Sequence, residues 1–393
     1  MTSNFVGKEV SEVRDLLVTS AVSGVHCLLL GAPGCGKTAM SIAAAEQMVG
    51  RDKMCIVRFN PTTSNDKIEG PVDIASLMVD PPVVRRVRIG TPYDQNTMIF
   101  VADEVSRPNE NIFDVLLDTL DMIEDTSGKA ILPEDAPVTF GTGNFLPKGE
   151  RTEALLDRFG IYKWIGDGTD PKEVARAKMM SKGGKLSLPG SLPNAKEIYD
   201  VRSAVPGLKA IEAVVAAVDE IAQAAMQGLV IDTPQGQTRR SFGKPNNRRV
   251  TIWQQILLRR SILDKGTTDF DEVSKVAKAM CAYAWVSRTP AEAADWKMLV
   301  GSLTDPVGAA IDQLMVSAFE RMNATVKAAL ASGKRQDAAQ ALGLLLSTSL
   351  QNLAKVVPET DPRYIEAQEL VTTQFAQFIS NKRDSFGSEV QDE

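Results

Sequence analysis

The sequence predicts an α/β fold, with a doubly wound, mostly parallel sheet followed by an all-α region. Apolar runs alternate with helical patterns up to residue 165, as they do in a parallel sheet covered by helices. A glycine-rich loop joins the first apolar run to a helix. From Asp170 onward the pattern becomes helical. We expect an α/β core over residues 1–168, a helical domain over 169–300 and a C-terminal helical extension over 301–393.

Composition is that of a globular protein of several domains. With 393 residues the chain is longer than a domain with a single hydrophobic core usually is. Its contents of 44% apolar and 24% charged residues are typical of globular proteins. No apolar run approaches the roughly 18 residues that a membrane span needs. The net charge of −6 gives no overall attraction to nucleic acid. Four scattered cysteines without metal-site spacing favour a reducing cytoplasm, and the single histidine, His26, is expected to be a core residue.

Residues 31–38 have the pattern of a phosphate-binding loop. The apolar run 25–30 before them is a predicted strand, and residues 39–48 after them are good helix formers. In this context Gly-x-x-x-x-Gly-Lys-Thr indicates a P-loop, against the alternative of a chance glycine turn. Lys37 can reach the β- and γ-phosphates of a nucleoside triphosphate, and the Thr38 hydroxyl can bind Mg²⁺. The residues expected to surround the phosphates are Gly34, Cys35, Gly36, Lys37, Thr38 and Ala39.

Two carboxylates end a later apolar strand. Residues 54–59 are a short β-rich run, and after an irregular stretch rich in Pro and Gly the apolar run 98–104 ends in Asp103 and Glu104. All-apolar strands are typical of parallel sheets, whose ligands bind at the carboxyl ends of the strands. Asp103 is therefore expected beside the P-loop as a second anchor of Mg²⁺, with Glu104 polarising the attacking water. The alternative is a solvated strand end.

A third polar residue is expected at the same edge of the sheet. Residues 109–121 have helical spacing, and the run 137–144 is a predicted strand that ends at Asn144. An amide there can orient water against the γ-phosphate, although an Asn beside Gly143 can also simply form a turn. A further strand is predicted over 161–165.

The remaining chain is predicted to be helical apart from one loop. Residues 228–247 are rich in Gly, Pro, Gln and Asn and are predicted to be a loop, and an apolar helix starts at Arg249. Three apolar stripes in the last ninety or so residues indicate helix–helix packing and no catalysis. They consist of Ile311, Met315, Ala318, Met322, Val326 and Leu330; Leu342, Leu345, Leu346 and Leu353; and Leu370, Val371, Phe375 and Phe378.

Together these residues resemble the AAA+ ATPases, and within them the MoxR family, over roughly residues 5 to 300. Residues 59–70 look like that family's segment after the second strand, and residues 101–107 resemble its Walker B run. Residues 142–144 are similar to sensor 1, and residues 153–159 to the arginine-finger helix. Two positions depart from the family pattern. Ser106 replaces the usual Asn, and Asn-Arg-Arg over 247–249 replaces the usual Ser-Pro-Arg of sensor 2.

The resemblance implies an oligomeric ring, expected to be a hexamer. Arg158 would be the finger that reaches the nucleotide of a neighbouring subunit, and Arg249, or its neighbour Arg248, would be sensor 2 on a helical lid. The alternative for each arginine is an exposed salt bridge. Residues 70–97 would hold the helix-2 insert and 122–137 the hairpin before sensor 1, both of which point toward the ring pore or the substrate face in this family.

The leading functional hypothesis is a Mg²⁺-dependent ATPase that remodels, matures or assembles a partner protein. The MoxR resemblance implies a partner with a von Willebrand A domain. An alternative is a nucleic-acid motor or loader, in which Arg85, Arg86 and Arg88 of the insert would line a pore. A third hypothesis is a structural or regulatory ring that binds nucleotide with negligible turnover, although the presence of Glu104 argues against it.

Overall fold

A computed structural model gives the structure of the protein. It describes residues 8–79, 83–107, 110–122, 131–132, 134–146, 149–166, 187–233 and 236–305, and beyond these 308, 311, 318, 321–322, 324, 335–357, 363–365, 367–369 and 371–373. The chain falls into two compact units. The first contains Met1–Ala222 and Pro245–Trp296, and the second contains Gln223–Lys244 and Lys297–Glu393.

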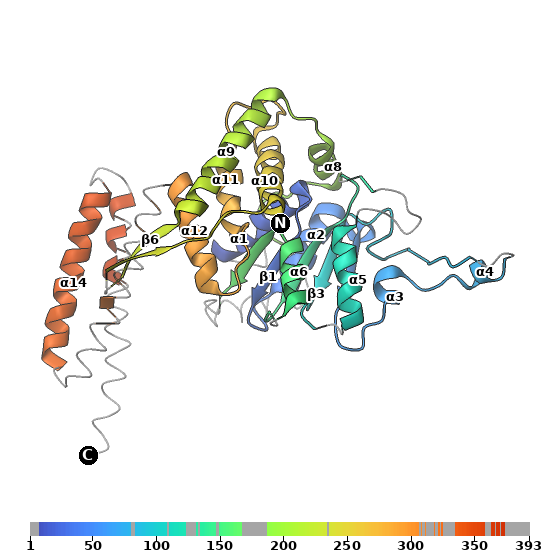
Figure 1. The fold of residues 1–393 in the computed structure, drawn as a ribbon, viewed down its shortest axis with the longest axis horizontal. Coiled ribbons are helices and arrows are strands. Elements are labelled where there is room, and N and C mark those ends of the chain that lie inside the picture. Colours follow the sequence, from blue (N-terminus) through green and yellow to red (C-terminus); the bar gives the residue numbers. More distant parts are fainter. Residues whose placement is uncertain are drawn as a thin grey trace, which may run out of the picture. The chain divides into compact units, whose positions relative to one another are not determined.

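The first unit is built on a five-stranded parallel sheet (Figure 1). Its strands are β1 (Cys27–Gly31), β2 (Met54–Arg58), β3 (Ile99–Asp103), β4 (Val138–Gly143) and β5 (Ile161–Ile165). They lie in the order β2-β3-β4-β1-β5, and each neighbouring pair is parallel, which confirms the predicted fold class. The carboxyl ends of the strands therefore meet at one edge. We call it the P-loop edge, and the edge where the strands begin the opposite edge.

Helices bury the sheet, which explains its continuous apolar strands. Every residue of β1, β3 and β4 is buried, so these strands show no alternation of polar and apolar residues. Helix α1 contacts α2, and α5 contacts α6. The bounds of these elements are α1 (Lys8–Ser23), α2 (Lys37–Val49), the 3-10 helix η1 (Arg51–Lys53), α5 (Glu110–Asp121) and α6 (Glu150–Arg158).

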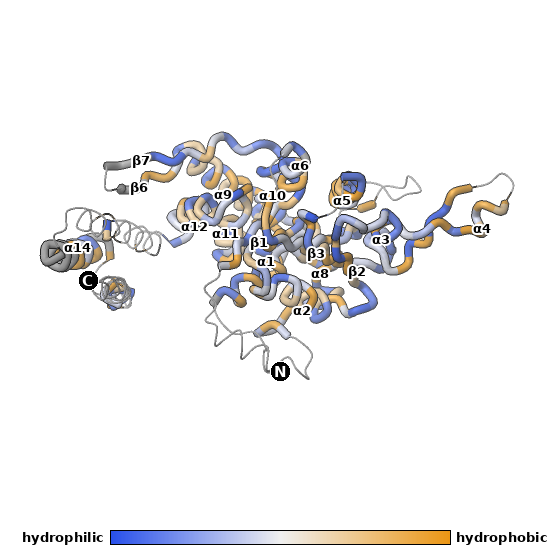
Figure 2. The backbone as a smooth tube through the Cα atoms, turned by 90° about the horizontal axis from the view of Figure 1, so that it is seen from below, coloured by the Kyte–Doolittle hydropathy of each residue, from blue (hydrophilic) through white to orange (hydrophobic). Residues whose placement is uncertain are grey.

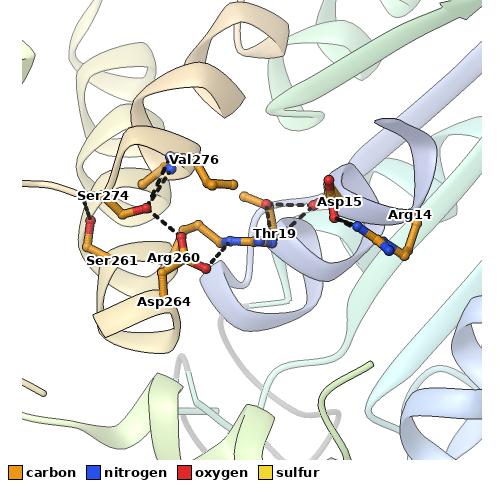
Figure 3. A network of polar contacts seen from close by, with 9 residues as sticks. Arg14, Asp15, Thr19, Arg260, Ser261, Asp264, Ser274 and Val276 are labelled. Atoms are coloured by element: carbon orange, nitrogen blue, oxygen red, sulfur yellow. Dashed lines mark hydrogen bonds and ion pairs between the residues drawn. The ribbon is translucent and has the colours of Figure 1, made fainter. Parts of the chain in front are cut away.

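Some of the helices that follow the sheet in the chain pack onto α1. The helices after the sheet are α8 (Ala195–Ser203), α9 (Leu208–Gln227), α10 (Asn247–Lys265), α11 (Lys275–Met280), η2 (Cys281–Tyr283) and α12 (Pro290–Thr304). Of these, α8, α10 and α11 contact α1. Arg260 of α10 pairs with Asp264 and donates a hydrogen bond to the Thr19 hydroxyl of α1 (Figure 3). The C-terminal half of α10 is thereby held against α1.

An arm extends from the sheet between β2 and β3 (Figure 1). It carries α3 (Asp66–Glu69) and, near its tip, α4 (Ile74–Leu77). Its two sides are joined by a hydrogen bond of 2.8 Å from the Val87 N–H to the Pro71 carbonyl. Much of the arm is hydrophobic (Figure 2). Its exposed apolar residues, which we call the apolar arm surface, are Val72, Ile74, Leu77, Met78, Val79, Val83, Val84, Val87 and Ile89.

The second unit contains a β-hairpin, so the prediction of a loop over 228–247 is wrong there. Strands β6 (Leu229–Thr233) and β7 (Gly236–Arg240) pair antiparallel, with Leu229 opposite Arg240. The Gly, Pro and Gln content indicated a loop, but the strand-forming residues Leu229, Val230 and Ile231 outweigh it locally. The region after the sheet is thus largely, and not wholly, helical.

The rest of the second unit is helical where it is described. Helix α14 (Arg335–Val356) packs its Leu345 and Leu346 against a cluster that includes Met322 and Val371. This confirms the predicted packing role of the stripes for these residues. None of the helices in the described part of the chain is long and apolar enough to cross a membrane.

Some predictions fall outside the described residues. They are the helical pattern starting at Asp170, most of the hairpin over 122–137, and the stripe residues Met315, Val326, Leu330, Leu370, Phe375 and Phe378.

Candidate functional site

The P-loop lies between β1 and α2, as the sequence predicts. Gly34 and Gly36 have φ values of 87° and 88°, in the left-handed region that residues with a Cβ avoid. A Cβ at Gly34 would meet no atom within 4 Å, so the loop needs glycine there for its backbone conformation and not for space. Gly36 is the N-cap of α2, with no side-chain cap on the first N–H groups of the helix. These N–H groups and the helix dipole make the loop a suitable cradle for phosphate.

Lys37 is buried at the start of α2. Its ammonium group donates hydrogen bonds to the carbonyl oxygens of Gly31 at 2.8 Å and Ala32 at 2.7 Å, and it lies 3.5 Å from the Cys35 sulfur. The side chain therefore folds back over the loop that is expected to surround phosphate. A phosphate oxygen can replace these neutral carbonyls as a stronger, charged partner.

Asp103 ends β3 and lies beside the first turn of α2. Its Oδ1 accepts hydrogen bonds from the Thr38 hydroxyl at 2.5 Å and the Thr142 hydroxyl at 2.7 Å, and its Oδ2 pairs with Nε of Arg58 at 2.7 Å. Burial alone would raise the pKa of Asp103. The three hydrogen bonds and the Arg58 charge outweigh burial and lower the pKa below its usual value, so this carboxylate is ionised at neutral pH.

The donor set at this point fits Mg²⁺. The ion prefers oxygen ligands, usually one or two protein groups together with water and phosphate oxygens. Thr38 and Asp103 supply a hydroxyl and an ionised carboxylate, whose oxygens are 2.5 Å apart at the mouth of the P-loop. The Ser106 hydroxyl, near Gly143 at the same edge, is buried without a hydrogen-bond partner among the described residues. Such a group is suited to binding an ordered water molecule.

Glu104 and Asn144 meet at the P-loop edge, one after β3 and the other after β4. The Asn144 amide nitrogen lies 2.8 Å from Oε1 and 3.1 Å from Oε2 of Glu104, and Arg107 Nε lies 3.0 Å from Oε2. Glu104 has a φ of 62°, the one positive value at a non-glycine residue in the described part of the chain. Such strain is typical of functional positions, and here it places the carboxylate against Asn144.

Arg158 lies at the opposite edge, as the last residue of α6. Its guanidinium group donates to the carbonyl oxygens of Leu117 at 3.1 Å and Ala154 at 3.0 Å, and it pairs with Asp121 at 2.6 Å. The next strand, β5, starts at Ile161 beside Cys27, the first residue of β1. Arg158 is thus separated from its own P-loop by the length of a five-residue strand, roughly 16 Å.

The two sensor 2 candidates occupy different environments. Arg248 is half exposed and pairs with Asp157 at 2.7 Å and with Asp121 at 3.2 Å. Arg249 is buried and lies 3.3 Å from the carbonyl oxygens of both Gly160 and Ala284. Both guanidinium groups lie nearer to the opposite edge than to their own P-loop. The sensor 2 assignment stays a prediction.

Several residues around the site were not singled out in the sequence. Arg58, Thr142 and Arg107 contact Asp103 or Glu104, and Asp121 joins Arg158 to Arg248. Arg58 is the last residue of β2 and Thr142 the last but one of β4, and both strands lie next to β3, so a known strand order would have drawn attention to both of them. Asp121 closes a helix and has no signal of its own in the sequence.

Parts of this chain are similar to known proteins. Residues 1–184 match the bpMoxR family, described as the MoxR domain in the MoxR-vWA-beta-propeller ternary systems. No curated protein matches the chain significantly. Among solved structures, a "putative ATPase" from Cytophaga hutchinsonii is 16% identical, with a TM-score of 0.47 over 72% of this chain and 82% of that one. A full-length MCM homolog from Methanopyrus kandleri is 14% identical, with a TM-score of 0.41 over 75% of this chain and 54% of that one.

The family match covers the whole sheet, the P-loop and the carboxylates at its edge. It includes the residues that the sequence singled out on chemical grounds, from Lys37 to Asn144, and also Arg158. Residues 1–184 of this chain therefore form a MoxR domain of the AAA+ ATPases, a family that binds ATP.

Proposed function

We propose that the protein hydrolyses ATP in a ring of identical subunits and uses the energy to remodel, activate or assemble a partner protein. The observation that carries this proposal is the meeting of Thr38, Asp103, Glu104 and Asn144 at the P-loop edge. A hydroxyl, an ionised carboxylate, a second carboxylate and an amide are the groups that phosphoryl transfer to water needs.

Substrate binding is assigned to the loop and to Lys37. Backbone N–H groups of the loop hold the phosphates, and the Lys37 ammonium group exchanges its carbonyl partners for the β- and γ-phosphate oxygens. Thr38 and Asp103 hold Mg²⁺, which supplies charge neutralisation on the phosphates when it is bound. The residues proposed to contact nucleotide are Gly34, Cys35, Gly36, Lys37, Thr38 and Ala39.

Hydrolysis is assigned to the pair formed by Glu104 and Asn144. Glu104 takes up the proton of the attacking water, and the Asn144 amide orients that water toward the γ-phosphate. Their direct contact of 2.8 Å supports a shared task, because two groups this close can hydrogen-bond to the same water molecule beside them. Arg107 also pairs with Glu104, and since it is exposed it can move away without a large penalty.

The ring is supported by the position of Arg158. A guanidinium group at the opposite edge cannot reach the nucleotide of its own subunit, whereas a head-to-tail ring brings that edge to the P-loop edge of the next subunit. We propose a hexamer in which Arg158 stabilises the charge on the γ-phosphoryl group of the neighbour. Such arginines are worth about 10³–10⁵ in rate. Arg249 is retained as a sensor 2 candidate beside Arg248.

A protein partner is favoured over nucleic acid by the arm. Of the three arginines proposed to line a pore, Arg86 pairs with Asp66 and Glu69, and Arg88 lies over the Tyr93 ring at 4.7 Å. The surface that the arm presents is apolar, which suits a protein and not a phosphate backbone. The family description names von Willebrand A and β-propeller components, and we propose that proteins of these classes are the partners.

The free thiols of all four cysteines fit a cytoplasmic protein.

Steady-state ATP hydrolysis tests the proposal. The wild-type protein is expected to turn over ATP with Mg²⁺, and the Lys37→Ala variant is expected to lose both binding and turnover. Single-stranded DNA or RNA at low salt should leave the rate unchanged. Stimulation by nucleic acid that declines steeply with salt would support the motor hypothesis instead. Nucleotide binding with no turnover in the wild type would support a regulatory ring.

A further inference from the structure

A cavity of about 1050 Å³ lies at the opposite edge of the sheet, away from the P-loop. Three of its lining residues come directly before strands: Lys53 before β2, Met98 before β3 and Pro137 before β4. Helix α8 adds Tyr199 and Arg202, which are three residues apart and therefore lie on one face of that helix. The cavity is thus separate from the proposed nucleotide site.

Arg202 is a buried cation in the wall of this cavity, and it is only 6% exposed. Its Nε donates a hydrogen bond to the carbonyl oxygen of Ala21 at 2.7 Å, and its Nη1 donates to that of Ala136 at 2.8 Å. Its Nη2 is buried and has no hydrogen-bond partner among the described residues, and no described carboxylate forms an ion pair with it. Burial lowers the pKa of Arg202 to about 10, so the group still carries its charge at neutral pH.

A purely structural role explains only two of the three nitrogens of Arg202. Nε and Nη1 join α8 to the last turn of α1 and to the segment before β4. Nη2 takes no part in this connection. A buried charged donor without a partner costs free energy, and folded proteins nearly always satisfy such groups. A ligand in the cavity can supply the acceptor that Nη2 lacks.

The lining favours a ligand group with a single negative charge. Asp94, Glu134 and Asp135 also line the cavity. Hydrogen bonds from the backbone N–H groups of Asn96 and Gly90 lower the pKa of Asp94, so this residue stays ionised. A phosphate dianion would be repelled by these acidic residues. A carboxylate brings one charge and matches the planar donors of a guanidinium group.

The rest of the wall suits a peptide. Tyr93, Met98 and Tyr199 offer aromatic and apolar surface, and the exposed amides of Gln95 and Asn96 can donate to and accept from a peptide backbone. The volume of about 1050 Å³ is at the upper end of the range of roughly 300–1,000 Å³ for pockets of drug-sized ligands, so a small organic acid would fill little of it. Because Tyr199 is 46% exposed, the cavity is open to solvent and a chain segment can enter it.

We propose that this cavity binds a peptide segment of another protein through one carboxylate of that segment, which pairs with Nη2 of Arg202. The carboxylate belongs to an Asp or Glu side chain or to a C-terminus, since both offer the same chemistry. The inference goes beyond the proposed function, because this binding needs neither nucleotide nor a ring.

Selection from peptide libraries tests the proposal on the full chain without nucleotide. One library of random hexapeptides is displayed with a blocked C-terminus and a second with a free C-terminus. Each is selected on the wild-type protein after removal of the peptides that bind Arg202→Met. Enrichment of Asp or Glu at one position of the first library supports a side-chain carboxylate, and enrichment in the second library alone supports a terminal one. If neither library yields a peptide that prefers the wild type, the proposal is overturned.

Amidation of a selected peptide isolates the ion pair. Replacing its carboxylate by an amide should weaken binding to the wild type at least about tenfold, because a hydrogen bond between charged groups is worth that much. The same replacement should leave binding to Arg202→Met unchanged, and fluorescence anisotropy measures each Kd. An equal loss in both proteins would overturn the pairing with Arg202. If N-acetyltyrosine bound the wild type as tightly as the hexapeptide does, the ligand would be a small acid and the peptide assignment would be wrong.

Arg259→Met is the matched control. Arg259 also donates to two backbone carbonyl oxygens, those of Val201 and Ala204 at the end of α8, and it is not among the described residues that line the cavity. Arg259→Met should lower the melting temperature about as much as Arg202→Met does and keep the peptide affinity. Loss of affinity in Arg259→Met as well would show that the packing of α8 governs binding and would overturn the role of the Arg202 charge.

Tyr199→Ala tests the same site even if Arg202→Met does not fold, and it then replaces that variant in the library selection. It removes a half-exposed side chain of the wall, so it should keep the wild-type melting temperature and weaken peptide binding about tenfold. Unchanged affinity in Tyr199→Ala would overturn the site. If the wild type binds these peptides but hydrolyses no ATP, the proposed function fails and this inference stands. ATP hydrolysis without carboxylate-dependent peptide binding overturns this inference alone.

Discussion

The Asn144 amide nitrogen lies 2.8 Å from a carboxylate oxygen of Glu104, although forty residues separate the two in sequence. Glu104 follows β3 and Asn144 follows β4, and these strands are neighbours in the sheet. Two residues that follow adjacent parallel strands necessarily lie at the same edge. The contact is therefore a direct consequence of the fold, and it is the place where we propose that the attacking water is held.

Glu104→Gln removes the proposed base and keeps an acceptor for Asn144. We expect hydrolysis to fall about 10²–10⁴-fold, because general-base catalysis typically contributes that much, while ATP still binds. Phosphate release and binding of a fluorescent ATP analogue measure the two effects. Arg107→Gln is the control, because it removes only the exposed partner of Glu104, and its rate should change less than about tenfold. An active Glu104→Gln protein would mean that another group activates water.

Thr38→Val keeps the shape of the side chain and removes the hydroxyl that faces Asp103. Loss of one oxygen ligand should raise the Mg²⁺ concentration needed for half-maximal hydrolysis by about 10- to 100-fold. A Mg²⁺ titration of ATPase activity measures this directly. Thr38→Ser keeps the oxygen and should resemble the wild type. If Thr38→Val and Thr38→Ser required the same Mg²⁺ concentration, the hydroxyl would not be a ligand.

His26 gives the protein a pH-dependent stability. Its Nε2 donates to Leu120 and its Nδ1 accepts from the N–H of Thr139, so the neutral ring is fixed in one tautomer, and burial lowers its pKa to about 4. Between about pH 6.5 and pH 4 the unfolded chain binds a proton that the folded chain does not. The free energy of unfolding is therefore highest above pH 6.5 with respect to this group and falls as the pH drops. The loss reaches up to about 3 kcal/mol, since each pH unit between the two pKa values is worth about 1.4 kcal/mol.

Denaturant unfolding of the wild type and of His26→Gln between pH 7 and pH 4 measures this contribution. The Gln amide can donate and accept but cannot titrate, and His26 is the single histidine of the chain. The variant should lose much less stability over this range. Parallel pH profiles for the two proteins would show that His26 does not control the effect.

The apolar arm surface is expected to bind the partner protein. Met78 and Val205 are each 83% exposed, the first on the arm and the second between α8 and α9. Because both side chains are already in water, Met78→Asp and Val205→Asp should each change the free energy of unfolding by less than about 0.5 kcal/mol. Only Met78→Asp should weaken binding of a von Willebrand A partner, as measured by titration calorimetry. Equal binding by both variants would remove the arm from the partner interface.

The sequence was most informative at positions where the fold and the expected chemistry both call for the same type of residue. The positions of the P-loop, Asp103 and Glu104 were predictable, because each lies at the end of an apolar strand and each carries a group that suits the binding of MgATP that we propose. Strand order was not predictable in the same way, since it depends on which strands pair across long separations. For that reason the contact of Arg58 with Asp103 was missed, although both residues end neighbouring strands.

Other features depend on tertiary packing that local patterns do not encode. Arg249 and Arg248 are adjacent in sequence, yet one is buried among carbonyl groups and the other faces Asp121. Which of them turns inward depends on the face that α10 presents to the helices it packs on, among them α1 and α11. The hairpin of β6 and β7 was missed because its turn-forming residues concealed a short run of strand formers.

A structure of the Glu104→Gln variant assembled with ATP and Mg²⁺ tests the central claim most directly. The account predicts a γ-phosphate between Lys37 and Asn144 of one subunit, a metal ion on Thr38 and Asp103, and the Arg158 guanidinium group of the adjacent subunit within hydrogen-bond distance of that phosphate. A nucleotide bound away from the P-loop edge, or a γ-phosphate that no residue of another subunit contacts, would contradict it.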